Sequence, residues 1–171
     1  PRGAMRHDLG NYAAIPFGGF KVVSMASNHA LDWGSDALID CIARLRRDGM
    51  VAPGVGFDIE EARQPAIMER NGARIAFLSY CSVAPKGYYA SKGKPGVAPM
   101  RALTHYEPLE DDQPGTPCEI YTYPVTEDLK ELLADVERTK LTVSPLKGED
   151  LQKLVGQVSS LPPDMLEKVR H

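Results

Sequence analysis

A short apolar stretch that ends in an Asn-His pair and a tight turn constrains this chain more than any other feature. Residues 20–34 read FKVVSMASNHALDWG, and an apolar strand followed by a polar turn and a helix is typical of α/β sheets. In such sheets, ligand sites form at the C-terminal ends of strands. Asn28 and His29 are therefore the first candidate site residues. The same pattern also fits a turn capped by Asn28, with His29 simply packed beside it.

The residues after this turn predict a βαβ unit. Residues 35–48 have the spacing of an amphipathic helix, with Ser35 as a suitable N-cap and Gly49 as a suitable stop. Residues 50–55 then read as a second strand. Two strands joined through a helix are expected to be parallel, and the connection is expected to be right-handed.

A hairpin follows the βαβ unit. Asp58 is a suitable cap for a short helix over residues 58–63. The dipeptide Asn71-Gly72 separates two runs of strand character, residues 66–70 and 73–80, and Asn-Gly favours the tight turn of an antiparallel hairpin. The second run is apolar enough to predict a central position in a sheet. These elements together predict an α/β fold with α+β elements: one βαβ unit plus one antiparallel hairpin.

Residues 81–117 change character, because proline and glycine recur throughout. A connection of this length is usually functional or disordered. It carries polar and aromatic side chains that could line a site, and a solvated surface excursion is the alternative; these side chains are Tyr88, Tyr89, His105, Tyr106 and Glu107. His105 is a further candidate ligand, although a lone histidine beside a tyrosine is also typical of a surface or packing residue.

The last part of the chain is predicted to be helical. Residues 118–123 alternate as a strand, and Thr126 is a suitable cap for the helix that follows. The expected buried stripe of that helix is Leu129, Leu132, Leu133 and Val136. Beyond about residue 140, two weaker helical patterns predict a helical C-terminal tail over residues 141–171.

Composition excludes several classes of protein. The 171 residues fit one domain with an appended segment, and a formal charge of −3 argues against a nucleic-acid partner. Cys41, Cys81 and Cys118 lack the spacing of a zinc site or a disulfide framework and are expected to be reduced. No apolar run approaches the roughly 20 residues that span a bilayer, and the first ten residues lack the apolar centre of a signal peptide. We therefore expect a soluble chain; its compartment is not defined by these features.

An ordered series of motifs over residues 18–140 resembles the CapA family of poly-γ-glutamate capsule biosynthesis. The motifs are SMASNHALDWG, GVGFDIEEARQPAIMERNGARIAFLSY and KGYYASKGKPGVAPMRALTHYEP. The resemblance implies a calcineurin-like metallophosphoesterase fold for residues 1–140 and suggests a cell-envelope setting. It further implies that Asn28 supplies an amide oxygen to a divalent metal, that His29 acts on a phosphate or leaving group, and that Asp32 supports the loop. A polyanionic or phosphorylated substrate is the implied partner.

The chain lacks other parts of the family pattern, so the resemblance implies an incomplete metal site. No D-x-H or G-D pair precedes Phe20, and TKLTVSPLKGED stands where the family has a histidine-bearing strand end. A metal such as Mn²⁺, Mg²⁺ or Ca²⁺ and no cofactor at all are equal alternatives, and whether the chain is an enzyme stays open. If it is active, it is expected to be a metal-dependent phosphoesterase-like hydrolase. If it is inactive, it is expected to be a folded binding or scaffold module.

Two further expectations follow from the same residues. A truncated sheet of this family would expose unpaired strand edges, which predicts self-association or partial disorder. The tail from about residue 141 is similar over a short stretch to the C-terminal segment of tripartite tricarboxylate transporter receptors. A receptor of that kind needs a two-lobed body, and the rest of this sequence has no matching series of strands and helices.

Overall fold

The computed structural model describes residues 8–110, 112, 115–142, 149–150 and 152–153. Contacts divide the chain into two units, Pro1–Leu141 and Thr142–His171, and the elements described below all belong to the first. Most of the predicted helical tail lies outside the described residues. No helix in the described part of the chain combines the length and the apolar character that crossing a membrane requires.

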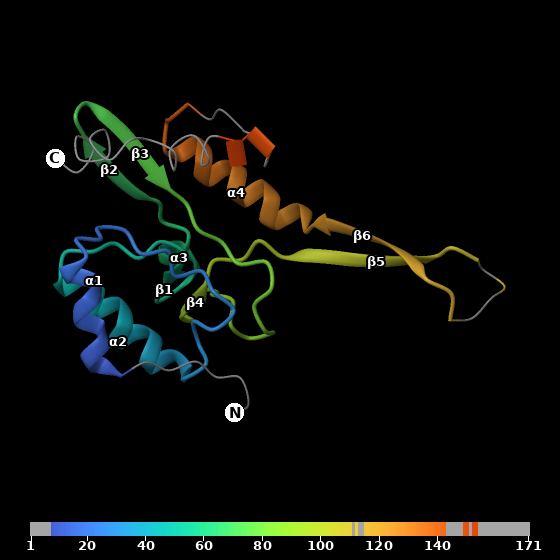
Figure 1. Ribbon diagram of the computed structural model, residues 1–171, viewed down its shortest axis with the longest axis horizontal. Helices are drawn as coiled ribbons and strands as arrows, with labels where there is room; N and C mark the ends of the chain where they lie inside the picture. The colour runs from blue at the N-terminus through green and yellow to red at the C-terminus, as the bar shows by residue number, and fades with distance from the viewer. Residues whose placement is uncertain (1–7, 111, 113–114, 143–148, 151, 154–171) are drawn as a thin grey trace. The chain divides into compact units, whose positions relative to one another are not determined.

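The fold mixes helices with small antiparallel sheets, which confirms the predicted mixed α/β class (Figure 1). The helices are the 3-10 helix η1 (Leu9–Ala13), α1 (Ala14–Phe17), α2 (Gly34–Arg47), α3 (Ile59–Ala62) and α4 (Thr126–Arg138). The strands are β1 (Val55–Gly56), β2 (Ala66–Arg70), β3 (Ala73–Phe77), β4 (Gly96–Val97), β5 (Ala102–Pro108) and β6 (Cys118–Pro124). They pair as β1 with β4, β2 with β3 and β5 with β6.

The two segments that flank α2 run parallel, as the βαβ pattern predicts. Val22 and Val51 form a parallel bridge, and the amide of Val23 donates to the carbonyl of Val51 over 2.9 Å. One face of α2 is buried through Leu38, Ile42 and Leu45. The predicted N-cap at Ser35 is wrong, because the helix begins one residue earlier, and the preceding residue does not cap it through a side-chain hydrogen bond.

The main apolar core packs α2 against the β1–β4 pair. Its buried members are Leu31, Leu38, Ile42, Val55, Cys81 and Val97. Val55 lies directly opposite Val97 in the antiparallel register, so a residue from the proline-rich segment reaches the centre of the core. The proline-rich segment therefore contains regular structure, since β4 and β5 both lie within residues 81–117.

The β2–β3 hairpin confirms the Asn-Gly prediction. Asn71 and Gly72 have φ values of 51° and 78°, and Arg70 lies opposite Ala73 across the turn. The prediction that the second strand is central in a sheet is wrong: in the described structure β3 pairs with β2 alone, and most of its residues are exposed. Helix α3 is capped as predicted, because the Asp58 carboxylate accepts from the amide of Glu61 over 3.0 Å.

The fully buried residues of helix α4 are acidic, while Leu129, Leu132 and Val136 of the expected apolar stripe are partly buried. The predicted Thr126 cap is wrong, because Thr126 is already the first residue of the helix. The N-cap position is occupied by Val125, whose side chain makes no capping hydrogen bond. The buried residues of α4 are Asp128 and Asp135, whereas Leu133 of the expected stripe is exposed. Arg101 donates to the Asp128 carboxylate through its backbone amide and its guanidinium, at 2.6 to 2.8 Å. Arg63 Nε and the Tyr80 hydroxyl donate to Asp135 at 2.8 and 2.7 Å.

Candidate functional site

Residues 27–33 form a series of tight turns between the parallel-paired segment and α2. The amide of Ala30 donates to the carbonyl of Ser27, and the amide of Asp32 donates to the carbonyl of His29, both over 3.2 Å. Leu31 is buried in the main core and fixes the middle of the turn. The polar side chains that precede it lie at the surface, where Asn28 is exposed and His29 is partly exposed.

His29 and Asp32 are brought together by this turn. Nδ1 of His29 lies 2.8 Å from Oδ2 of Asp32, and the imidazole is 34% exposed while the carboxylate is only 9% exposed. Because a carboxylate can only accept, the proton of this bond sits on Nδ1. Nε2 is then the ring nitrogen left for chemistry, either as a base or, once protonated, as a donor.

The structure adds Tyr88, which the sequence placed only among several polar residues of the proline-rich segment. Its hydroxyl donates to Oδ1 of Asp32 over 3.3 Å. Burial raises the pKa of the Tyr88 phenol, and the charge of Asp32 together with this hydrogen bond raises it further. The two residues are 56 positions apart, so no spacing in the sequence could single out Tyr88.

His105 lies elsewhere in the fold, on β5. It is exposed and faces Tyr121 across the β5–β6 pair. The hydrogen bonds that join His29, Asp32 and Tyr88 do not involve His105. A contribution from His105 to the site stays a prediction.

The described donors do not make a complete metal site. Within the described ranges, no three His, Cys, Asp or Glu side chains gather closely enough to hold a metal ion. Asn28 offers one amide oxygen, and both oxygens of Asp32 are already engaged by His29 and Tyr88. Divalent cations of the Mg²⁺ and Ca²⁺ type take six or more oxygen ligands. These residues alone therefore do not fit the bound metal that the resemblance implies.

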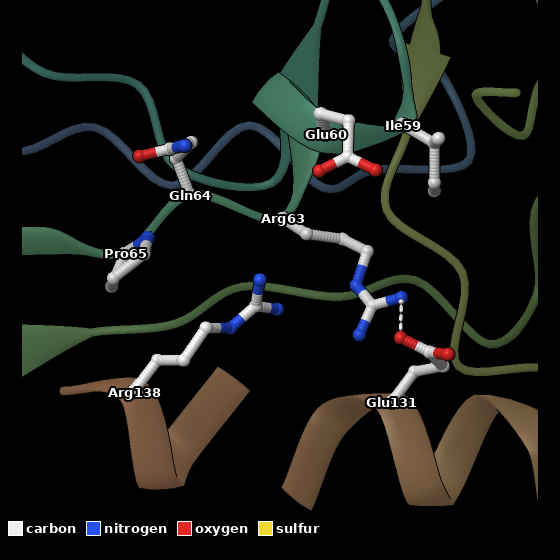
Figure 2. A pocket seen from close by; sticks show the side chains of 7 residues that line it. All are labelled: Ile59, Glu60, Arg63, Gln64, Pro65, Glu131 and Arg138. Carbon is white, nitrogen blue, oxygen red and sulfur yellow. Dashed lines mark ion pairs between the residues drawn. The ribbon is translucent and has the colours of Figure 1, made fainter. Parts of the chain in front are cut away.

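A separate cavity of about 480 Å³ lies between the end of α3 and α4 (Figure 2). It is lined by Ile59, Glu60, Arg63, Gln64, Pro65, Glu131 and Arg138. Figure 2 shows the Arg63 side chain reaching toward Glu131 of α4, and the two form an ion pair of 2.6 Å. None of the predicted site residues lines this cavity, and its Arg63–Glu131 ion pair is one of the contacts that join α4 to the residue after α3.

Comparison with known proteins identifies the family. Residues 3–148 match the family described as bacterial capsule synthesis protein PGA_cap. The chain is 32% identical over 81 residues to the PGA biosynthesis protein CapA of Bacillus subtilis, covering 47% of this chain and 21% of that protein. It is 28% identical over 87 residues to the capsule biosynthesis protein CapA of Bacillus anthracis, covering 51% and 21%.

A mycobacterial relative extends the comparison. The chain is 32% identical over 94 residues to a probable polyglutamine synthesis accessory protein of Mycobacterium tuberculosis, covering 53% of this chain and 25% of that protein. The matched parts thus span only about a fifth to a quarter of these relatives. The family match nevertheless covers most of the sequence, and the chain belongs to the bacterial capsule synthesis protein family PGA_cap.

Proposed function

We propose that this chain contributes the Asn28–His29 part of a phosphoesterase-like centre that serves poly-γ-glutamate capsule synthesis at the cell envelope. The observation that carries the proposal is the 2.8 Å bond between His29 Nδ1 and Asp32, which directs Nε2 away from the carboxylate. A partly exposed imidazole held in this way can donate a proton to a leaving group or stabilise a phosphate oxygen. The names of the relatives, which refer to PGA and capsule biosynthesis, support the same setting.

The proposed substrate is polyanionic or phosphorylated. A protonated His29 offers one charge-assisted donor to such a group, and the exposed amide of Asn28 offers a neutral donor or acceptor beside it. Because the described donors do not complete a metal site, the chemistry assigned to this chain is that of His29 alone.

A non-catalytic binding or scaffold module is the second candidate. It is favoured by one specific observation, namely that the described part of the chain gathers no cluster of three metal-ligating side chains. In this case the folded α2 and β1–β4 core would present the turn as a binding surface. His29 would then contact a partner without transferring a proton.

Metal binding separates the two candidates. We would titrate Mn²⁺ into the full chain by calorimetry and repeat the titration with an Asn28→Ala, His29→Ala double variant. Micromolar binding that the double variant abolishes supports the phosphoesterase-like centre and justifies hydrolysis assays. Absence of binding to the wild type refutes a metal-dependent centre in this chain and favours the scaffold module.

His105→Ala is the matched control for this titration. It removes one exposed imidazole from β5 without touching the turn. We expect the affinity for Mn²⁺ to stay unchanged in this variant. Loss of binding in His105→Ala would instead assign His105 as a ligand and overturn a site confined to the turn.

A further inference from the structure

We infer that Tyr88 is a positioning residue for His29, and that it acts by holding the Asp32 carboxylate in the orientation that fixes the imidazole. The inference rests on the proposed function of His29 and extends it to the proline-rich segment. Three side chains form one hydrogen-bonded series, from the Tyr88 hydroxyl to Asp32 and from Asp32 to His29.

The Asp32 carboxylate is engaged at both ends. Oδ1 accepts from the Tyr88 hydroxyl over 3.3 Å, while Oδ2 lies 2.8 Å from Nδ1 of His29. Rotating the carboxylate about its terminal torsion would move both oxygens and break both contacts. Terminal torsions of this kind have broad energy wells, so each hydrogen bond to a carboxylate oxygen narrows the range of orientations that the group can adopt. The bond from Tyr88 therefore adds a restraint on Oδ1 to the one that His29 places on Oδ2.

The position of Tyr88 is set by the core. Its carbonyl accepts from the amide of Val97 over 2.9 Å, and its amide donates to the carbonyl of Pro85 over 3.0 Å. Val97 is fully buried and lies opposite Val55 of β1, so the backbone of Tyr88 is tied to the β1–β4 pair. The Tyr88 ring also packs against the main core cluster.

Gly96 shows how closely these backbones meet. A Cβ atom added at Gly96 would lie 2.4 Å from the carbonyl oxygen of Tyr88. The segment before β4 thus has little room to shift relative to the strand. This close approach requires a glycine at position 96. It places the Tyr88 hydroxyl beside the turn that carries His29, although the two segments are far apart in the sequence.

The chemical consequence concerns the tautomer of His29. A neutral imidazole can carry its proton on either nitrogen, and the acceptor at one nitrogen decides which form prevails. The Asp32 carboxylate at Nδ1 places the proton there and leaves a lone pair on Nε2. The phenol of Tyr88 stays protonated at neutral pH, because burial and the Asp32 charge raise its pKa. It is therefore a constant donor to Asp32.

The test compares the ¹⁵N chemical shifts of the two His29 ring nitrogens in wild type and in Tyr88→Phe, at an alkaline pH where the imidazole is neutral. We expect wild type to show mainly the Nδ1–H tautomer and Tyr88→Phe to show a mixture with a raised Nε2–H share. Asp32→Ala serves as the reference for full loss of the fixed tautomer. Amide signals of Val55 and Val97 confirm in each variant that the β1–β4 pair is intact.

Tyr89→Phe is the matched control. It removes a neighbouring hydroxyl whose ring packs on the same core cluster, but which has no contact with Asp32 among the described hydrogen bonds. Its tautomer ratio is expected to equal that of wild type. A Tyr88→Phe spectrum that matches wild type overturns the inference, and so does an equal shift in Tyr89→Phe.

The measurement is independent of metal and substrate. A changed tautomer ratio in Tyr88→Phe together with no Mn²⁺ binding by the wild type would retain the positioning role and refute the metal-dependent centre. An unchanged ratio with micromolar Mn²⁺ binding would do the reverse. The two hypotheses therefore fail separately.

Discussion

Replacing Asp135 by alanine should destabilise the fold more than any other single change on α4. The Asp135 side chain is 1% exposed and accepts from Arg63 and Tyr80, and Arg138 forms a further ion pair with it. The Arg63 side chain is itself only 13% exposed. Removing Asp135 would leave this buried guanidinium, within the described part of the chain, with the ion pair to the largely exposed Glu131.

The size of the loss follows from that burial. Removing one partner of a buried ion pair typically costs about 3–5 kcal/mol, because the other charge stays desolvated. A whole domain is stable by only about 5–15 kcal/mol, so Asp135→Ala should remove a large share of the free energy of unfolding. For a urea dependence of about 2 kcal/mol per molar, the midpoint should fall by roughly 2 M.

Asp128→Ala is the matched control on the same helix. Asp128 is also buried, but its partner Arg101 is 51% exposed and can return to water once the carboxylate is gone. We expect a smaller loss of about 1–3 kcal/mol, typical of a buried hydrogen-bonding group that loses its partner. Urea unfolding followed by circular dichroism measures both variants.

A double variant tests the reason for the difference. Arg63→Met with Asp135→Leu removes both charges and keeps the volume, and such replacements are often neutral or stabilising. It should therefore be more stable than Asp135→Ala. Equal midpoints for Asp135→Ala and Asp128→Ala, or a double variant no better than Asp135→Ala, would refute the argument from an uncompensated buried charge.

Two further predictions concern pH and the β2–β3 turn. Hydrogen bonds from Arg101 hold the pKa of Asp128 below its usual value, so this pair stabilises the fold above the ordinary carboxyl pKa of about 4, and the contribution is lost as pH falls through the lowered value. Arg101→Gln should therefore lose less stability between pH 7 and pH 3 than wild type, in urea titrations at each pH; an unchanged difference would contradict this. Gly72 has a φ of 78°, so Gly72→Ala should cost about 1 kcal/mol in the same assay, and full stability in that variant would show that the turn relaxes without strain.

Local patterns predicted the elements whose causes are local. The periodicity over residues 35–48 located α2 to within one residue, and Asn71-Gly72 identified the β2–β3 hairpin, since the positive φ values it needs are a property of those two residues. The Asp58 cap was also predicted, because its acceptor and donor are three residues apart. The Ser35 cap failed because the turn beginning at Ser27 leads directly into the helix at Gly34.

Long-range contacts could not be predicted in this way. The leucine stripe of α4 predicted an apolar buried face, whereas the fully buried residues are Asp135 and Asp128. Their partners Arg63 and Arg101 lie 72 and 27 residues away in the sequence. The candidate site likewise combines residues that are close in the sequence with one that a long-range contact brings in. Asn28, His29 and Asp32 are neighbours in sequence and could be proposed together, whereas Tyr88 reaches Asp32 only because β4 pairs with β1.

The different attachments of α2 and α4 make the two helices respond to opposite solution conditions. Helix α2 is held by apolar side chains, and such contacts weaken in the cold and strengthen in kosmotropic salts. Helix α4 is held through carboxylate–guanidinium pairs, and the pair with the half-exposed Arg101 is screened as ionic strength rises. Low temperature at low ionic strength should therefore weaken the packing of α2 before that of α4. High ionic strength at a higher temperature should weaken the packing of α4 first.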